Sequence, residues 1–124
     1  MMGEMVMSQP NANAPDSQQG GHNPSSPVER FLHAERPGFR ILEQRIPAQQ
    51  QVPWHYHTGV RDVFYILQGQ VRLSLRSPEE EILLAPGDTF TVAIRRPHRV
   101  TNAGEGLAII FVLQAGPYDF VPVP

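Results

Sequence analysis

Two residue types that carry much enzyme chemistry are missing from this sequence. It has no cysteine, which excludes disulfide bonds, thiol nucleophiles and thiolate metal ligands. It has no lysine either, since all ten cationic residues are arginines, and this excludes Schiff-base catalysis by lysine. Beyond residue 26 the only serines are Ser74 and Ser77, which disfavours a serine nucleophile. The chemistry left to the chain is that of histidine, carboxylate and metal.

Charge and long apolar runs are also scarce. With a formal net charge of −2 the chain has no basic field for a phosphate backbone, so we expect no nucleic-acid partner. The longest apolar run, residues 107–113, is far shorter than the roughly 18 residues of a membrane span, so we expect no membrane partner. No arginine precedes Arg30 and the N-terminal stretch has no apolar segment, which argues against a secretory signal and predicts a cytoplasmic protein.

The composition changes near residue 27. Residues 1–27 contain no aromatic side chain and are rich in Asn, Gln, Ser, Gly and Pro, so they predict a flexible N-terminal tail in which His22 is solvated. Residues 28–124 are long enough for one domain with a modest core.

That second part shows short β-like segments separated by proline and glycine and no helical period. The expected strands cover residues 39–46, 54–57, 60–67, 71–75, 81–84, 89–94, 98–102 and 107–114. Their spacing predicts an all-β sandwich or closed barrel. Residues 116–124 form an extended tail, and the aromatic rings of Tyr118 and Phe120 suggest that it covers a barrel end or a partner.

Three histidines and one aspartate are the candidate site residues. His55 and His57 are two positions apart on an expected strand, so their imidazoles lie on the same face and can share one ion. Asp62 starts the next strand, and His98 follows Pro97 at the start of another. Neutral imidazole is a good ligand for transition metals.

These residues carry a resemblance to the cupin superfamily. The first cupin motif ends H-x-H, three or four residues, E, six residues, G, and this chain has His55-x-His57, four residues, Asp62, six residues and Gly69. The second motif is G, five residues, P-x-G, two residues, H, three residues, N. Here it reads Gly87, five residues, Ala93-x-Arg95, two residues, His98, three residues and Asn102.

The resemblance implies a double-stranded β-helix, or jelly roll, that holds one divalent transition metal ion inside the barrel. It implies His55, His57, Asp62 and His98 as the metal ligands. The ligand set is compatible with Fe, Mn, Ni, Zn or Cu and does not choose among them.

Three positions depart from the motifs. Asp62 replaces the glutamate and is about 1.5 Å shorter, so it could bind directly, bind through a water or support a ligand. Ala93 and Arg95 replace the proline and the second glycine, which leaves the course of the loop before His98 open. Arg95 and Arg96 are either a cationic rim for an anionic substrate or two solvated loop arginines.

Alternation along the strands places an apolar set inside the barrel, namely Phe64, Ile66, Val71, Leu73 and Val100. Trp54 and Tyr56 alternate oppositely to the histidines and are expected on the outer face. Such a pocket suits a small, partly apolar ligand that chelates the metal through oxygen.

Three functions are consistent with these features. The first is a metalloenzyme, of the dioxygenase or the isomerase or lyase type. The second is a non-catalytic module that senses a small ligand or a metal, and the third is a metal-free structural barrel. The fold does not decide between them. We also expect a homodimer.

Overall fold

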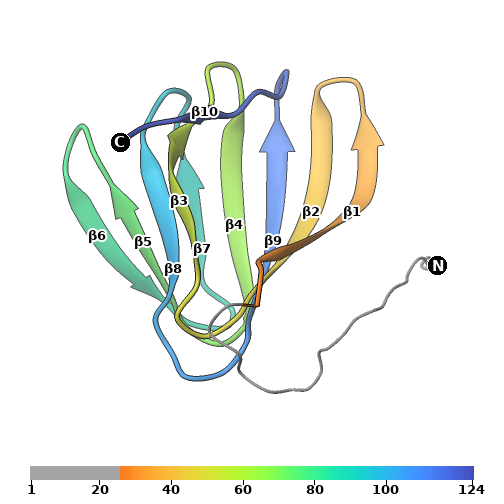
Figure 1. Ribbon diagram of the computed structural model, residues 1–124. Coiled ribbons are helices and arrows are strands. Elements are labelled where there is room, and N and C mark those ends of the chain that lie inside the picture. Colours follow the sequence, from red (N-terminus) through yellow and green to blue (C-terminus); the bar gives the residue numbers. More distant parts are fainter. Residues whose placement is uncertain (1–25) are drawn as a thin grey trace.

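Two five-stranded antiparallel sheets curve around a common interior in the computed structural model, which describes residues 26–124 (Figure 1). The strands are β1 (Glu29–Arg36), β2 (Phe39–Ile46), β3 (Gln51–Tyr56), β4 (Arg61–Gln68), β5 (Val71–Leu75), β6 (Glu80–Leu84), β7 (Thr89–Val92), β8 (His98–Asn102), β9 (Ala108–Ala115) and β10 (Val121–Pro122). Within this part of the chain there is no helix, and hence none long and apolar enough to cross a membrane.

The order of the strands is that of a jelly roll. One sheet has the order β1-β2-β9-β4-β7 and the other β10-β3-β8-β5-β6. From β2 onward the chain passes repeatedly from one sheet to the other, so that both sheets are wound from the same stretch of sequence. The predicted all-β double-stranded β-helix is therefore confirmed.

The two end strands, β1 and β10, were not predicted from the sequence. β1 reads ERFLHAER, is mostly exposed, and pairs only with β2 at the edge of its sheet. A register irregularity between Leu32 and Ala34 breaks its alternation further, so no period-2 pattern was visible. The predicted flexible tail, residues 1–27, lies almost entirely outside the described residues, as does His22.

A bulge in β3 sets the direction of two of the histidines. The strand starts at Gln51, earlier than predicted, and runs through Pro53, which the register accommodates with an irregularity between Val52 and His55. Proline is tolerated at a bulge because the ladder hydrogen bonds are already interrupted there. As a result Val52 and His55, three positions apart, both point into the interior.

The core fills the space between the sheets. The five residues predicted to face inward are all 3% exposed or less, and they belong to a cluster with aliphatic side chains from both sheets. Trp54 points the other way, as expected. Its ring lies against the guanidinium groups of Arg76 and Arg99, at 4.0 and 5.2 Å from ring centroid to guanidinium carbon.

The loop before His98 turns at Arg95, which stands where the motif has a glycine. Arg95 adopts a left-handed backbone conformation with φ of 68°, and its N–H donates to the carbonyl of His57 at 2.8 Å. Arg96 does not form a cationic rim for a substrate. Its guanidinium donates to the carbonyls of Arg76 and Pro78 and pairs with Glu80 at 3.0 Å. Arg96 therefore holds this loop against the β5–β6 turn.

Replacing Arg95 by glycine should leave the protein equally stable or slightly more stable. The left-handed conformation costs a side-chain-bearing residue about 1–2 kcal/mol, and the extra chain entropy of glycine offsets only part of that gain. Thermal unfolding of Arg95→Gly and of Arg95→Ala checks this, because alanine keeps the strain. A glycine variant less stable than the alanine variant would contradict it.

Candidate metal centre

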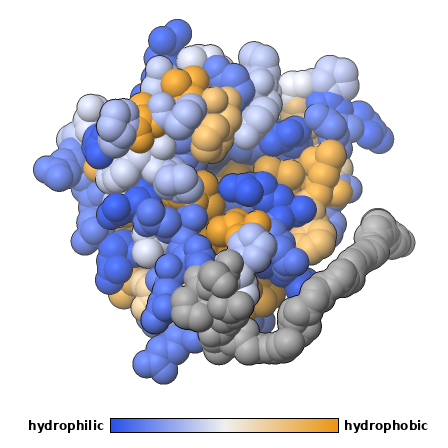
Figure 2. Space-filling view, in the orientation of Figure 1, coloured by the Kyte–Doolittle hydropathy of each residue, from blue (hydrophilic) through white to orange (hydrophobic). Residues whose placement is uncertain are grey.

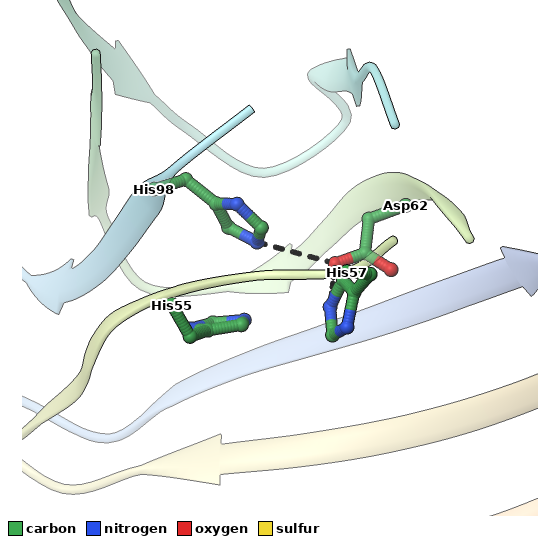
Figure 3. A group of neighbouring side chains, drawn as sticks. All are labelled: His55, His57, Asp62 and His98. Carbon is green, nitrogen blue, oxygen red and sulfur yellow. Dashed lines mark hydrogen bonds and ion pairs between the residues drawn. The ribbon is translucent and has the colours of Figure 1, made fainter. Parts of the chain in front are cut away.

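The four candidate residues meet inside the barrel. His55 comes from β3, His57 follows the end of that strand, Asp62 comes from β4 and His98 begins β8. Each is 4% exposed or less, and their candidate ligand atoms all lie within 4.8 Å of one another. Figure 3 shows the three imidazoles and the carboxylate facing one another across the interior. Residues separated by up to 43 positions in the sequence are thus brought into one group.

Each imidazole has its Nδ1 against a backbone carbonyl. Nδ1 of His55 lies 2.8 Å from the carbonyl of Pro53, Nδ1 of His98 lies 2.9 Å from that of Arg96, and Nδ1 of His57 contacts that of Asp119. Because a carbonyl can only accept, Nδ1 must carry the proton in all three rings. In the neutral rings Nε2 is then an acceptor, which is the form that binds a metal.

When all three rings are neutral, their Nε2 atoms and the Asp62 carboxylate are acceptors that face one another without a donor. Nε2 of His57 and Nε2 of His98 lie 3.1 and 3.3 Å from Oδ2 of Asp62 (Figure 3). Two imidazole lone pairs facing a buried carboxylate oxygen repel one another unless a cation stands between them. Protonation of a ring satisfies one contact, whereas a divalent ion satisfies all four groups together. The donor set therefore fits a metal ion.

Asp62 is held in place through its other oxygen. Gln114, on β9, donates from Nε2 to Oδ1 of Asp62 at 3.0 Å, and its own Oε1 accepts from Nη2 of Arg40 at 2.8 Å. The guanidinium of Arg40 is stacked on the ring of Tyr118 at 3.8 Å. The register places Arg40, Gln114 and Asp62 side by side on β2, β9 and β4. Sequence reasoning missed Gln114 and Arg40, although both sit at inward positions of their strands.

The C-terminal segment closes the end of the barrel. Figure 1 shows it crossing the upper ends of the strands after β9. Phe120 stacks on His55 with ring centroids 4.5 Å apart, and Tyr118 lies 5.4 Å from His57. The carboxylate of Asp119 accepts from the amide and hydroxyl of Thr58 at 2.8 and 2.6 Å. The segment thus covers the barrel end, one of the two roles expected for its aromatic rings.

The electrostatics of the metal-free group match this geometry. Burial lowers the pKa of His55 to about 4, assisted by the neighbouring charges of His98 and His57. Burial alone would raise the pKa of Asp62, but hydrogen bonds and charge from His57 and His98 lower it well below its ordinary value. For His57 burial is outweighed by the hydrogen bond and charge of Asp62, so its pKa is raised. In the absence of metal, His57 therefore takes up a proton more readily than His55.

The metal-free protein should lose stability as the pH falls from 6.5 to 4. In this window His55 takes up a proton in the unfolded chain but not in the fold, so the unfolded state is favoured by roughly 3 kcal/mol at the lower end. The raised pKa of His57 changes the free energy of unfolding only above pH 6.5, and the lowered pKa of Asp62 changes it only below pH 4. Neither residue therefore adds to the pH dependence between 6.5 and 4. Urea unfolding of chelator-treated protein measures the profile. His55→Gln should flatten it, and an unchanged slope in that variant would contradict this explanation.

A cavity of about 400 Å³ is lined in part by three of the four residues, His55, His57 and Asp62. Its walls combine apolar side chains with a few polar ones: Arg30, Arg40, Leu42, Gln44, Val52, His55, His57, Asp62, Phe64, Val100, Gln114, Tyr118 and Phe120. This volume and mixture are typical of a small-molecule site.

Comparison with known proteins agrees with the fold. The sequence profile of the family described as "Cupin domain" matches residues 42–113, more than half of the chain. No curated protein matches. Among solved structures, TT1209 from Thermus thermophilus has 26% identity and a TM-score of 0.68, and the match covers 83% of this chain and 96% of that one.

Two structures with enzyme names are also similar. The oxalate decarboxylase formate complex from Lactobacillus farciminis has 14% identity and a TM-score of 0.70, over 77% of this chain and 31% of that one. The DMSP lyase DddQ from Ruegeria pomeroyi has 17% identity and a TM-score of 0.68, over 77% and 51%. This chain thus spans about a third of the first enzyme and half of the second, and at these identities the likeness is one of fold.

Proposed function

The chain belongs to the cupin superfamily, and from this premise we propose that it is a small metalloenzyme acting on a small molecule inside its barrel. The observation that carries the proposal is the cluster of four buried groups, all of them acceptors, next to a cavity of about 400 Å³. A purely structural barrel needs no such arrangement, because buried acceptors without a donor destabilise the fold.

We assign the ligand atoms as Nε2 of His55, His57 and His98 and Oδ2 of Asp62. Of the three roles considered for Asp62, direct binding is the one we propose, since Oδ2 already lies 3.1 and 3.3 Å from two of the Nε2 atoms. The backbone carbonyls that accept from Nδ1 keep the rings in the metal-binding tautomer and fix their orientation.

A divalent ion in such a site would supply Lewis acidity or, if it is redox-active, oxygen chemistry. The residues of the chain do the rest. Gln114 and Arg40 keep the Asp62 carboxylate oriented, Phe64 and Val100 give the ligand an apolar wall, and Phe120 covers the His55 ring at the end of the barrel. Three imidazoles and one carboxylate suit both an isomerase or lyase and a dioxygenase, so the identity of the metal decides the assay.

The proposal is tested by a turnover screen. The protein is prepared in Fe, Mn, Ni, Zn and Cu forms and incubated with panels of organic acids, aromatic diols and diketones, with mass spectrometry as the readout. Turnover with at least one metal form, lost in the chelated protein, is expected. Tight binding of a compound without any product from any form would instead support a non-catalytic binding module.

We also propose that the protein is a homodimer. Support comes from the outer face of the sheet β1-β2-β9-β4-β7, where Tyr65 and Leu67 are 44% and 41% exposed beside Ile109 and Phe111. Light scattering after size exclusion should give twice the chain mass, and a monomer would contradict the dimer.

The cytoplasmic location stays a prediction, which fractionation of the native cells can test.

A further inference from the structure

The cavity contains a second polar group that the metal centre does not use. Arg30 on β1 and Gln44 on β2 are paired in the register, and both line the cavity. Gln44 is 8% exposed, and its Oε1 is buried without a hydrogen-bond partner in the part of the chain that the structure describes. A buried amide oxygen without a donor costs about 1–3 kcal/mol, so this atom calls for a donor from a ligand.

This group lies away from the metal centre along the sheet. Arg40, next to the centre, is followed by Leu42 and then by Gln44 on the same inward face of β2. Two residues of a strand advance about 6.7 Å, so Gln44 stands roughly 13 Å from Arg40 along β2. Leu42 and Phe64 form an apolar wall between the two polar ends. Figure 2 shows hydrophobic and strongly hydrophilic residues meeting around the hollow on the side where β1 begins.

The charge of the cavity selects an anion. Among the described residues that line it, the ionised side chains are Arg30, Arg40 and Asp62. Adding a divalent ion would make the lining more positive still. A cavity whose lining carries a net positive charge attracts anions and disfavours ammonium groups. The donor that Gln44 needs is therefore a hydroxyl group rather than an amine.

We propose that this end of the cavity recognises a small hydroxycarboxylate. A carboxylate of the ligand pairs with the guanidinium of Arg30, a hydroxyl donates to Oε1 of Gln44, and the oxygens of the other end face the metal centre. The assignment rests on the proposed function, since it takes the metal centre as the second anchor of the ligand. It adds the substrate class, an organic acid that bears at least one hydroxyl group.

The test compares matched pairs of acids on the metal-loaded protein. Malate, citrate and glucarate each carry hydroxyl groups that succinate, tricarballylate and adipate lack, and isothermal titration measures their binding. At least one hydroxy acid should bind about tenfold or more tightly than its partner. Sorbitol, which has hydroxyls without a carboxylate, should not bind.

Two variants test the roles of Arg30 and Gln44 in ligand binding separately. Arg30→Gln should weaken binding of that hydroxy acid by about tenfold or more, as expected for a lost charge-assisted hydrogen bond. Gln44→Leu should remove the preference over the deoxy partner and leave the binding of the deoxy acid itself. Arg36→Gln, on the same strand but bonded to the carbonyl of Glu35, is the control and should bind like the wild type.

Metal content is measured in every sample, which separates the two claims. A wild-type protein that takes up no metal would overturn the proposed function and this inference with it. A loaded protein that binds no hydroxy acid more tightly than its partner, or whose Arg30→Gln variant behaves like Arg36→Gln, would overturn the hydroxycarboxylate inference and leave the metal centre standing.

Discussion

Replacing His98 by alanine should lower metal affinity by more than about 100-fold and abolish turnover. Removing a mere supporting group of a metal ligand typically costs 10- to 100-fold, so loss of the ligand itself should cost more. His98 is 1% exposed and its Nε2 lies 3.3 Å from Oδ2 of Asp62, at the centre of the group. Competition with a chromogenic chelator measures the affinity.

His33→Ala is the matched control for this variant. His33 also lies on a strand, but its Nε2 contacts Glu43 at 2.8 Å and its side chain is 38% exposed. The control variant should retain metal and turnover. Equal metal affinity of His98→Ala and wild type would exclude His98 from the site.

The second large effect is expected at Gly116, where the C-terminal segment leaves β9. Its φ is 123°, a conformation that side-chain-bearing residues rarely adopt, and an added Cβ would collide with the backbone oxygen of Gly59. Gly116→Ala must therefore shift the segment that carries Asp119 and Phe120. We expect a loss of about 2–4 kcal/mol in the free energy of unfolding and a fall in melting temperature of roughly 10 °C or more.

The same variant should weaken metal binding. Displacing the segment removes the Asp119 carbonyl from Nδ1 of His57, and with it the contact that sets the tautomer of this imidazole. Loss of such a contact typically costs 10- to 100-fold in affinity. Gly106→Ala is the control, because an added Cβ there meets nothing within 4 Å. A Gly116→Ala variant as stable as Gly106→Ala would contradict this account of the C-terminal segment.

Much of the fold could be predicted because the inner strands are half-buried. Strands such as β8 and β9 alternate between buried and partly buried residues, and turn residues separate the strands, so their limits follow from local sequence. β1 could not be found this way, since an edge strand needs only one neighbour and tolerates charge on both faces. β10 is only two residues long and is held by pairing with β3 rather than by its own pattern.

The candidate site, like the fold, could be predicted only in part. The H-x-H spacing and the positions of Asp62 and His98 could be predicted, because alternation and turns place them on one side of their strands. Their supporting contacts could not be predicted from local sequence. Gln114 reaches Asp62 across 52 positions, and the Asp119 carbonyl reaches His57 across 62, so only the tertiary fold brings these partners together.

The cavity group also depends on register. Arg30 lies in a strand without a visible pattern, and Gln44 is an inward amide in a strand whose other buried residues include Leu42 and Ile46. In the sequence alone, nothing distinguishes Arg30 or Gln44 from other polar residues. Pairing of β1 with β2 is what places them side by side on the cavity wall.

The central claim is that His55, His57, Asp62 and His98 together hold one metal ion. Elemental mass spectrometry on the untagged protein, purified without chelators or added metal, tests it most directly, with His55→Ala measured beside the wild type. We expect close to one equivalent of a single transition metal per chain in the wild type and none in the variant. A wild-type protein that contains no metal, and takes up none on reconstitution, would contradict it.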